Sequence, residues 1–307
     1  MLGLTYHDKS PEAEGDGPIQ VTIGEGFNVN NKAWMKTFAA ELNLELSTDP
    51  RQGKALGAFQ NQSTIDPVTK TRSYAASAYY TPEIAKRPNL VVLTETLVSR
   101  VIFDTASGTD ALGVEVITKD GQTKQILAGT EVILSAGALQ TPQILELSGV
   151  GDRHLLEKHG IPVVFDDPNV GEHVQDHPVV CQSFEVADGV LSGDVLRDPN
   201  VFQALLDMYQ ASRDGPLGQS SISVAYAPLV DGSGIMSTEA KKELLAQHDA
   251  TLTTPGAQAI RKLIESDEGA FEFILFPCQV SLPDKPAASR PASFRPCQRT
   301  ISRSRPC

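Results

Sequence analysis

The chain has 307 residues, enough for about two domains with a substantial core. Its formal net charge of -12 excludes an extended basic face of the kind that binds nucleic acid, and disfavours adhesion to anionic lipid. No apolar run approaches the ~20 residues that a membrane helix needs, and residues 1–17 lack the basic and apolar regions of a secretory signal. We therefore expect no nucleic-acid or membrane partner. The compartment stays open, with cytoplasm as the default, and so does the oligomeric state.

The first third of the chain predicts short elements joined by loops. Residues 18–23 alternate between polar and apolar, which is typical of a short strand. Asn31 is a candidate N-cap for a helix on which apolar residues recur at helical spacing: Trp34, Phe38 and Leu42. Residues 71–90 predict a helical segment that is closed near Pro82.

An antiparallel meander is predicted in the middle of the chain. Residues 89–98 form an apolar strand, and three short strands follow, separated by turns at Ser107-Gly108 and Asp120-Gly121. The run TEVILSAGA (130–138) ends the block as a strand of the kind that is buried on both faces. The meander is therefore predicted to be inserted between two apolar strands of another sheet.

The stretch GALQTPQILELSGVG (137–151) combines small residues with a strand end. Thr141 is expected to cap the next helix with Pro142 at its first position, and Ser148-Gly149 is expected to end it. In open parallel sheets, ligands bind beyond the carboxyl ends of strands. From these residues alone an ordinary strand–turn–helix is favoured, and a ligand contact at the bare backbone around Gly137 is the alternative.

The remaining sequence is mixed. Helices are predicted at 152–160, 201–209 and 238–248, and strands at 161–167 and 270–277. The tail, 283–307, holds five prolines, five arginines, one lysine and one acid, a composition too polar to order itself. An abnormal C-terminus, such as read-through into non-coding sequence, is favoured over a basic interaction tail. The cysteines form no Cys-x-x-Cys pair and support neither a zinc site nor a disulfide framework: Cys181, Cys278, Cys297 and Cys307.

The 137–151 stretch resembles the second signature of the glucose–methanol–choline (GMC) flavoprotein oxidoreductases, and its surroundings are similar in order and spacing. The similar segments include TRSYAASAYY, RPNLVVLTETLVSRVIF, ALGVEV, EVILSAGA and HGIPVVFDDPNVGEHVQDH. The likeness covers about residues 15–230 and is greatest to fungal members of the glucose-oxidase and aryl-alcohol-oxidase type. The signature positions that match are Gly137, Ala138, Thr141, Pro142, Ile144, Leu145, Ser148, Gly149, Val150 and Gly151.

The resemblance implies FAD as cofactor and a small-molecule alcohol as substrate. Members of the family pass a hydride from the alcohol to the flavin while a histidine takes the hydroxyl proton. Val98 matches the family position whose backbone meets the adenine ring. Ala136 and Gly137 match the strand end close to the ribose and phosphates.

The sequence also departs from the family pattern. No GxGxxG turn occurs; the nearest candidate, 23–26, lacks the third glycine. The catalytic histidine of the family and its partner lie beyond the region of likeness, and none of this chain's histidines matches them: His7, His154, His159, His173, His177 and His248. No catalytic residue is therefore assigned.

Two polar pairs allow alternatives. His173 and His177 stand four apart, as metal ligands on a helix would, but Gly171 and Pro178 bracket them, so a structural loop in which Asp176 bonds backbone amides is favoured and no metal is expected. Arg72-Ser73 is interpreted as a structural polar pair, with a substrate contact as the alternative.

The predicted fold class is α/β, a partial Rossmann-like FAD-binding domain with an inserted β-meander plus a partial α+β substrate domain. Residues 1–88 and 181–282 are assigned to the substrate domain and connecting segments, and 89–180 to the FAD domain. The predicted function is a GMC-type oxidoreductase that oxidises an alcohol, with a place in fungal secondary metabolism. The alternative is a non-catalytic, truncated remnant that lacks the pyrophosphate motif and the catalytic histidine.

Overall fold

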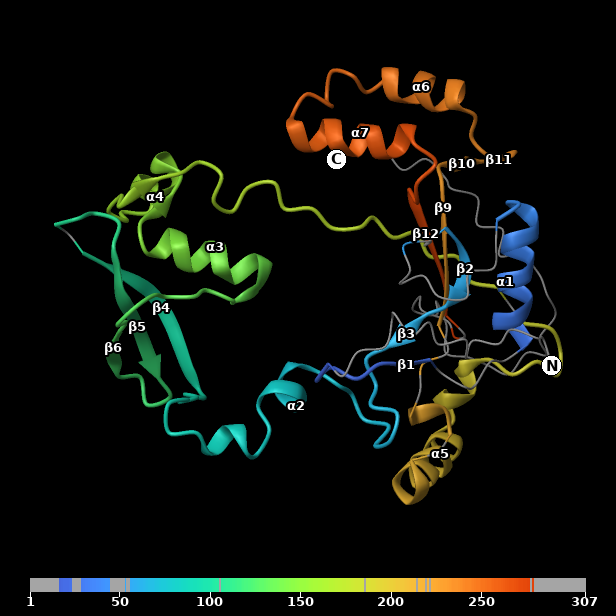
Figure 1. Ribbon diagram of the computed structural model, residues 1–307, viewed down its shortest axis with the longest axis horizontal. Coiled ribbons are helices and arrows are strands. Elements are labelled where there is room, and N and C mark those ends of the chain that lie inside the picture. Colours follow the sequence, from blue (N-terminus) through green and yellow to red (C-terminus); the bar gives the residue numbers. More distant parts are fainter. Residues whose placement is uncertain are drawn as a thin grey trace. The chain divides into compact units, whose positions relative to one another are not determined.

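The computed structural model has a mixed α/β fold and divides into two compact units (Figure 1). Unit 1 comprises residues 1–85 and 181–307, and unit 2 comprises residues 86–180. The structure describes residues 17–23, 29–44, 53, 56–104, 106–184, 186–213, 215–218, 220, 222–276 and 278.

Unit 1 is built on a three-stranded antiparallel sheet in the order β12-β9-β2. The central strand, β9 (Ser223–Ala227), lies between β2 (Gly57–Gln60) and β12 (Phe271–Leu275). Helix α1 (Val29–Glu41) packs against this sheet. The core between them consists of small and flexible side chains surrounded by aromatic rings: Met35, Ala58 and Ala225, with Trp34, Phe38 and Phe273.

Shorter elements complete unit 1. Helices α6 (Thr238–Ala246) and α7 (Pro255–Glu265) are held together by Lys241, whose side chain is 1% exposed. Its ammonium donates to the backbone carbonyl of Ser266, directly after α7, and to the Asp267 carboxylate, each at 2.9 Å. The other elements are β1 (Thr22–Ile23), β3 (Gln62–Ser63), α2 (Ala75–Tyr79), η4 (Gly193–Arg197), α5 (Pro199–Ser212), η5 (Pro216–Gly218), β10 (Val230–Asp231) and β11 (Gly234–Ile235); the 3-10 turn η3 (Ile84–Lys86) lies where the units join.

Unit 2 contains the predicted meander. Strands β4 (Thr96–Phe103), β5 (Ala111–Thr118) and β6 (Thr123–Leu127) form an antiparallel sheet in the order β4-β5-β6. The hairpin turn at Asp120-Gly121 joins β5 and β6, with the Gly121 amide donating to Thr118. The prediction of three short strands with two turns is confirmed.

Helix α3 (Gly137–Leu147) follows the meander and leads into a small parallel pair. Strand β7 (Val150–Gly151) pairs with β8 (Phe165–Asp166), and α4 (Arg153–Lys158) lies between them in the chain. The exit from α3 at Ser148-Gly149 is as predicted. Gly149 has φ +89°, and a Cβ there would lie 2.4 Å from the Pro162 carbonyl oxygen, so only glycine fits this turn.

Two predicted apolar strands are wrong. β4 begins only at Thr96, and residues 131–135 are not part of any strand. Within the described chain no segment pairs with 131–135, although burial alternates along it, with Val132 and Leu134 half-buried and Ile133 74% exposed. A strand needs a partner for its backbone hydrogen bonds, and alternating side chains cannot supply one.

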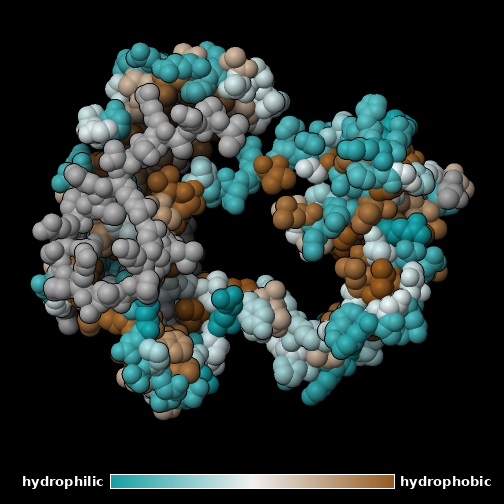
Figure 2. All heavy atoms as spheres, turned by 180° about the vertical axis from the view of Figure 1, so that it is seen from behind, coloured by the Kyte–Doolittle hydropathy of each residue, from teal (hydrophilic) through white to brown (hydrophobic). Residues whose placement is uncertain are grey.

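The unpaired segments leave apolar side chains at the surface. Figure 2 shows hydrophobic side chains on the exterior of the molecule, and in unit 2 Val91 is 76% and Leu139 76% exposed. Exposed apolar surface of this kind is typical of a region that another chain segment or a ligand covers.

Both predicted helix N-caps are wrong. Helix α1 begins at Val29, so Asn31 is not its N-cap; Asn31 is buried and its amide donates to Ser223 Oγ at 2.8 Å. Helix α3 begins at Gly137, so Pro142 lies inside the helix and Thr141 is not its N-cap.

Other predictions are too long or fall outside the described part. In 18–23 only β1 is strand, and in 71–90 only α2 and η3 are helical. The tail at 283–307 lies outside the described residues, as do His7 and most of the 23–26 Gly candidate.

Candidate functional site

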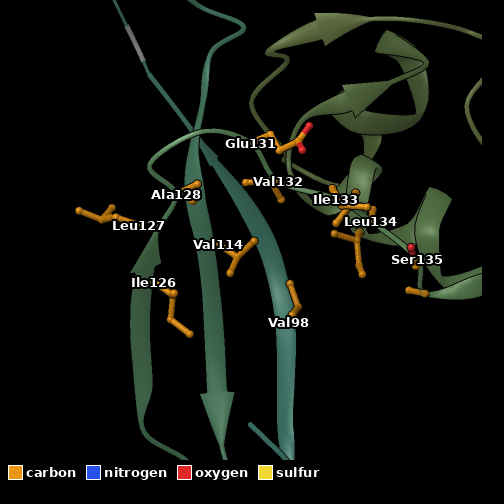
Figure 3. A pocket seen from close by; sticks show the side chains of 13 residues that line it. Val98, Val114, Ile126, Leu127, Ala128, Glu131, Val132, Ile133, Leu134 and Ser135 are labelled. Carbon is orange, nitrogen blue, oxygen red and sulfur yellow. The ribbon is translucent and has the colours of Figure 1, made fainter. Parts of the chain in front are cut away.

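An open groove of about 520 Å³ lies on the meander sheet of unit 2. Its lining comes from all three strands, from residues 131–136 and from α3. Figure 3 shows Val98, Val114 and Ile126 on neighbouring strands, with Val132 to Ser135 on the segment that follows them. The lining is mostly apolar, and Glu131 is its one ionisable residue among the described residues.

The register of the meander explains why these side chains share one face. Val98 pairs with Val116 and Val114 pairs with Ile126, and because Val114 and Val116 are two apart, all four point to the same side. Val101, opposite Val114, also lies on this side. Because Val98 and Val101 are three residues apart, their side chains would point to opposite faces of the sheet in a regular strand.

A β-bulge between Val98 and Arg100 produces this arrangement. The bulge is pinned by Arg100, whose guanidinium donates to both carboxylate oxygens of Glu115 at 3.1 and 2.9 Å, and by Ser99 Oγ, which donates to Glu115 at 3.0 Å. The hydrogen bonds from Arg100, and then from Ser99, hold the pKa of the Glu115 carboxyl below its ordinary value. The bulge thereby places the side chains of Val98 and Val101 on the same face of the sheet.

The groove ends at the start of α3, where the backbone is bare. Gly137 has φ +92°, and nothing lies within 4 Å of the position where a Cβ would stand. The Ala136 amide donates to Thr141 Oγ1 at 3.0 Å, and the helix has neither a side-chain cap nor an acidic residue in its first turn. Its first N–H groups therefore have no intrahelical partner and form a site suited to an anion or a hydroxyl.

The α3 exit fixes the position of this helix against β4. Ser148 is 8% exposed, and its Oγ accepts a hydrogen bond from the Val101 amide at 2.8 Å. Val101 lies on β4, an edge strand of the sheet, so this amide has no strand beyond it to pair with. The serine thus joins the end of α3 to the strand that carries Val98.

The structure brings the predicted site residues together. Val98 and Ala136 both line the groove, and Gly137 follows Ala136 at its end. Sequence reasoning did not assign Val114, Ile126 and Ile144, which also line it. The positions of Val114 within β5 and of Ile126 within β6 were a usable signal, but they do not say which face of the sheet carries a groove.

Of the other polar candidates, Asp176 and Ser73 form hydrogen bonds within the fold. Asp176 accepts a hydrogen bond from the His177 amide at 2.8 Å, as predicted for a loop, and His173 and His177 are exposed outside any helix. Ser73 is buried, and its Oγ accepts from the Gln20 amide at 2.8 Å. Across the described ranges no cluster of histidine, cysteine, aspartate or glutamate suits a metal ion, and no helix is long and apolar enough to cross a bilayer.

Residues 5–179 match the family described as GMC oxidoreductase. Dehydrogenase mpl7 of Monascus purpureus is 36% identical over 224 residues, which make up 71% of this chain and 36% of that protein. The chain thus spans about a third of the length of this curated relative.

Solved structures show a similar fold. A FAD-dependent oxidoreductase from Chaetomium thermophilum superposes with a TM-score of 0.65 at 26% identity, over 82% of this chain and 46% of that one. A fungal aryl-alcohol oxidase gives a TM-score of 0.69 at 22% identity, over 85% of this chain and 46% of that one. At that identity the second likeness concerns the fold alone.

Proposed function

Because the chain belongs to the GMC oxidoreductase family, whose cofactor is FAD, we propose that its unit 2 binds the adenosine end of FAD within an alcohol-oxidising enzyme. Unit 2 is the proposed FAD-binding part, and unit 1 is the proposed part of the substrate domain. The enzyme belongs, in this proposal, to fungal secondary metabolism. The observation that carries the proposal is the bare backbone at Ala136-Gly137 beside an apolar groove.

The residues present fit the adenosine part of the cofactor. The apolar side chains of Val98, Val114 and Ile126 suit the flat faces of a purine, and the bulged backbone of β4 offers hydrogen-bonding groups at its edge. The open space over Gly137 admits a ribose or phosphate to the backbone amides of α3.

In this proposal these residues bind and orient the cofactor, and they take no part in the chemical step. When bound, FAD accepts a hydride from the alcohol. The groove's part is to exclude water from the purine and to hold one end of the dinucleotide, so that its position is fixed relative to the substrate. No described residue is assigned to proton transfer.

Calorimetric titration of the full chain tests this division of labour. We expect FAD and AMP to bind and riboflavin to bind far more weakly, since the groove serves the adenosine end. Gly137→Ala places a methyl group in the open space and should weaken AMP binding at least about tenfold. Gly108→Ala is the matched control, because Gly108 also has positive φ and open space but lies in a hairpin turn away from the groove. Equal weakening by both changes would contradict the assignment.

The alternative, a non-catalytic remnant, is favoured by a different observation. The unpaired apolar segments around Val91 and Ile133 leave surface that a complete sheet would cover. The absorption spectrum of the purified protein separates the two functions. Flavin bands near-stoichiometric with protein support the enzyme, and a colourless soluble protein supports the remnant.

A further inference from the structure

Unit 1 contains a second cleft, of about 620 Å³, whose lining is mainly polar. Its lining comes from residues 63–65 and 70–74, which form the hairpin that follows β3, and from Tyr209 of helix α5 and Leu217. Lys70 and Arg72 line it together with the hydroxyl-bearing residues Ser63, Thr64, Thr71, Ser73, Tyr74 and Tyr209. No acidic residue occurs among the described residues of this lining, although the whole chain has a net charge of -12.

The hairpin that carries the two cations is rigidly built. Asp66 accepts hydrogen bonds from the Val68 and Thr69 amides at 2.9 and 2.7 Å, which close the loop. The Asp66 amide donates to the Thr71 carbonyl, and Ile65 bridges to Arg72, so the two arms of the hairpin are held together. Hydrogen bonds from the Thr69 amide, and then from the Val68 amide, lower the pKa of the Asp66 carboxyl. The carboxylate therefore stays ionised, and the loop keeps these hydrogen bonds, in mildly acidic solution.

Helix α5 fixes the hairpin from outside. The Tyr209 hydroxyl donates to the Lys70 carbonyl at 2.9 Å. The position where a Gly218 Cβ would stand is 3.1 Å from Lys70 Cβ, so the two backbones are in close contact. Lys70 itself adopts φ +54°, a left-handed conformation that the surrounding bonds hold in place.

Neither cation is paired with an acidic residue in the described part of the chain. Among the described residues, the Lys70 and Arg72 side chains form no ion pair, whereas Arg100, Arg153 and Arg261 all do. Two unpaired cations among hydroxyl donors on a fixed hairpin match the requirements of an oxyanion, which accepts several charge-assisted hydrogen bonds at once.

We propose that this cleft binds a small molecule through a phosphate or carboxylate group held between Lys70 and Arg72. Thr71, whose hydroxyl also bonds that of Thr69 at 2.8 Å, and Tyr74 line the same cleft and complete the proposed set of donors. The volume exceeds that of a lone anion and leaves room for the organic part of such a molecule. The site lies in unit 1 and does not depend on the cofactor groove of unit 2.

Calorimetric titration with inorganic phosphate, pyrophosphate and benzoate tests the proposal on the full chain. The phosphate probes and the carboxylate probe distinguish the two kinds of oxyanion. At least one should bind, and the double change Lys70→Gln and Arg72→Gln should weaken it at least about tenfold. Affinity should also fall with added NaCl, because charge attraction carries much of it.

A matched pair of residues controls for net charge. Lys86 and Arg87 are exposed, form no ion pair among the described residues and lie outside the cleft, so Lys86→Gln with Arg87→Gln removes the same charge. We expect this control to change affinity less than about twofold. Lys70→Gln with Arg72→Gln should weaken the probe's binding by the same factor in a Gly137→Ala background as in the wild type, which separates this proposal from the one for unit 2. Equal loss in the two double variants, or no binding of any probe, would overturn the proposal.

Discussion

Ser148 offers the sharpest test of how the groove is held together. Its Oγ accepts the Val101 amide at 2.8 Å, and both residues are buried, at 8% and 4% exposure. Ser148→Ala removes the acceptor and leaves an amide on the edge strand that neither water nor another strand reaches. An unsatisfied buried amide costs about 1–3 kcal/mol, and the small volume lost adds little.

Hydrogen exchange measured by mass spectrometry on individual segments reports this loss of stability in β4 and α3. A loss of about 1–3 kcal/mol speeds amide exchange in β4 and α3 about 5- to 150-fold if the two elements open together. Unit 1 should exchange as before, because the serine's hydrogen bonds to Val101 and Ile144 lie within unit 2. Ser107→Ala is the control: Ser107 is exposed, and its Oγ accepts only a long 3.4 Å bond from Asp110. If both variants exchange alike in β4, the serine does not join helix and strand as argued.

Other parts of the fold give further predictions. Gly149→Ala should destabilise unit 2 by more than about 1 kcal/mol, because the methyl group meets the Pro162 carbonyl and φ is positive; exchange in α3 and β8 measures it. The pKa of Glu115 is lowered by Arg100, so its contribution to stability is present above the ordinary value of 4.5 and is lost as pH falls through the lowered pKa. The protection of β4 amides, measured relative to their intrinsic exchange rates at each pH, should therefore fall more steeply below pH 4.5 in the wild type than in Glu115→Gln. Lys241→Ala should cost about 1–3 kcal/mol, because a buried side chain and its bonds to the α7 end are lost; urea unfolding followed by circular dichroism tests it.

Controls for these changes come from the same elements. Gly121→Ala sits at positive φ with open space, so it should cost less than Gly149→Ala, which combines strain with a clash. Lys242→Ala, on the exposed side of α6, should change stability by less than about 0.5 kcal/mol. If β4 in Glu115→Gln loses protection in acid as steeply as in the wild type, the ionisation of Glu115 does not cause the loss.

The meander could be predicted from sequence because its information is local. The Asp120-Gly121 turn and the apolar alternation around Val114 fix the strands and their register without reference to the rest of the chain. Helix α3 likewise ends where Gly149 permits a left-handed exit. The β4 bulge at Ser99 could not be predicted, because it depends on an ion pair across two strands.

The strand predicted at 131–135 does not form, because its formation cannot be decided from the local sequence. Its residues have strand propensity and alternating burial, but strand formation depends on a partner that the local sequence does not contain. The start of α3 failed for a related reason: Thr141 and Pro142 are typical N-terminal residues, yet the Ala136 amide uses the Thr141 hydroxyl from outside the helix. Val98, Ala136 and Gly137 were assigned through the family resemblance; Val98 and Ala136 line one groove, and Gly137 follows Ala136 in the chain.

Hydrogen exchange of the full chain with and without saturating FAD tests the central claim most directly. If the groove holds the adenosine end, FAD should slow exchange in residues 96–103 and in residues 131–140, AMP should reproduce this pattern, and riboflavin should not. Protection confined to unit 1, or no protection in either segment while FAD is bound, would contradict the claim.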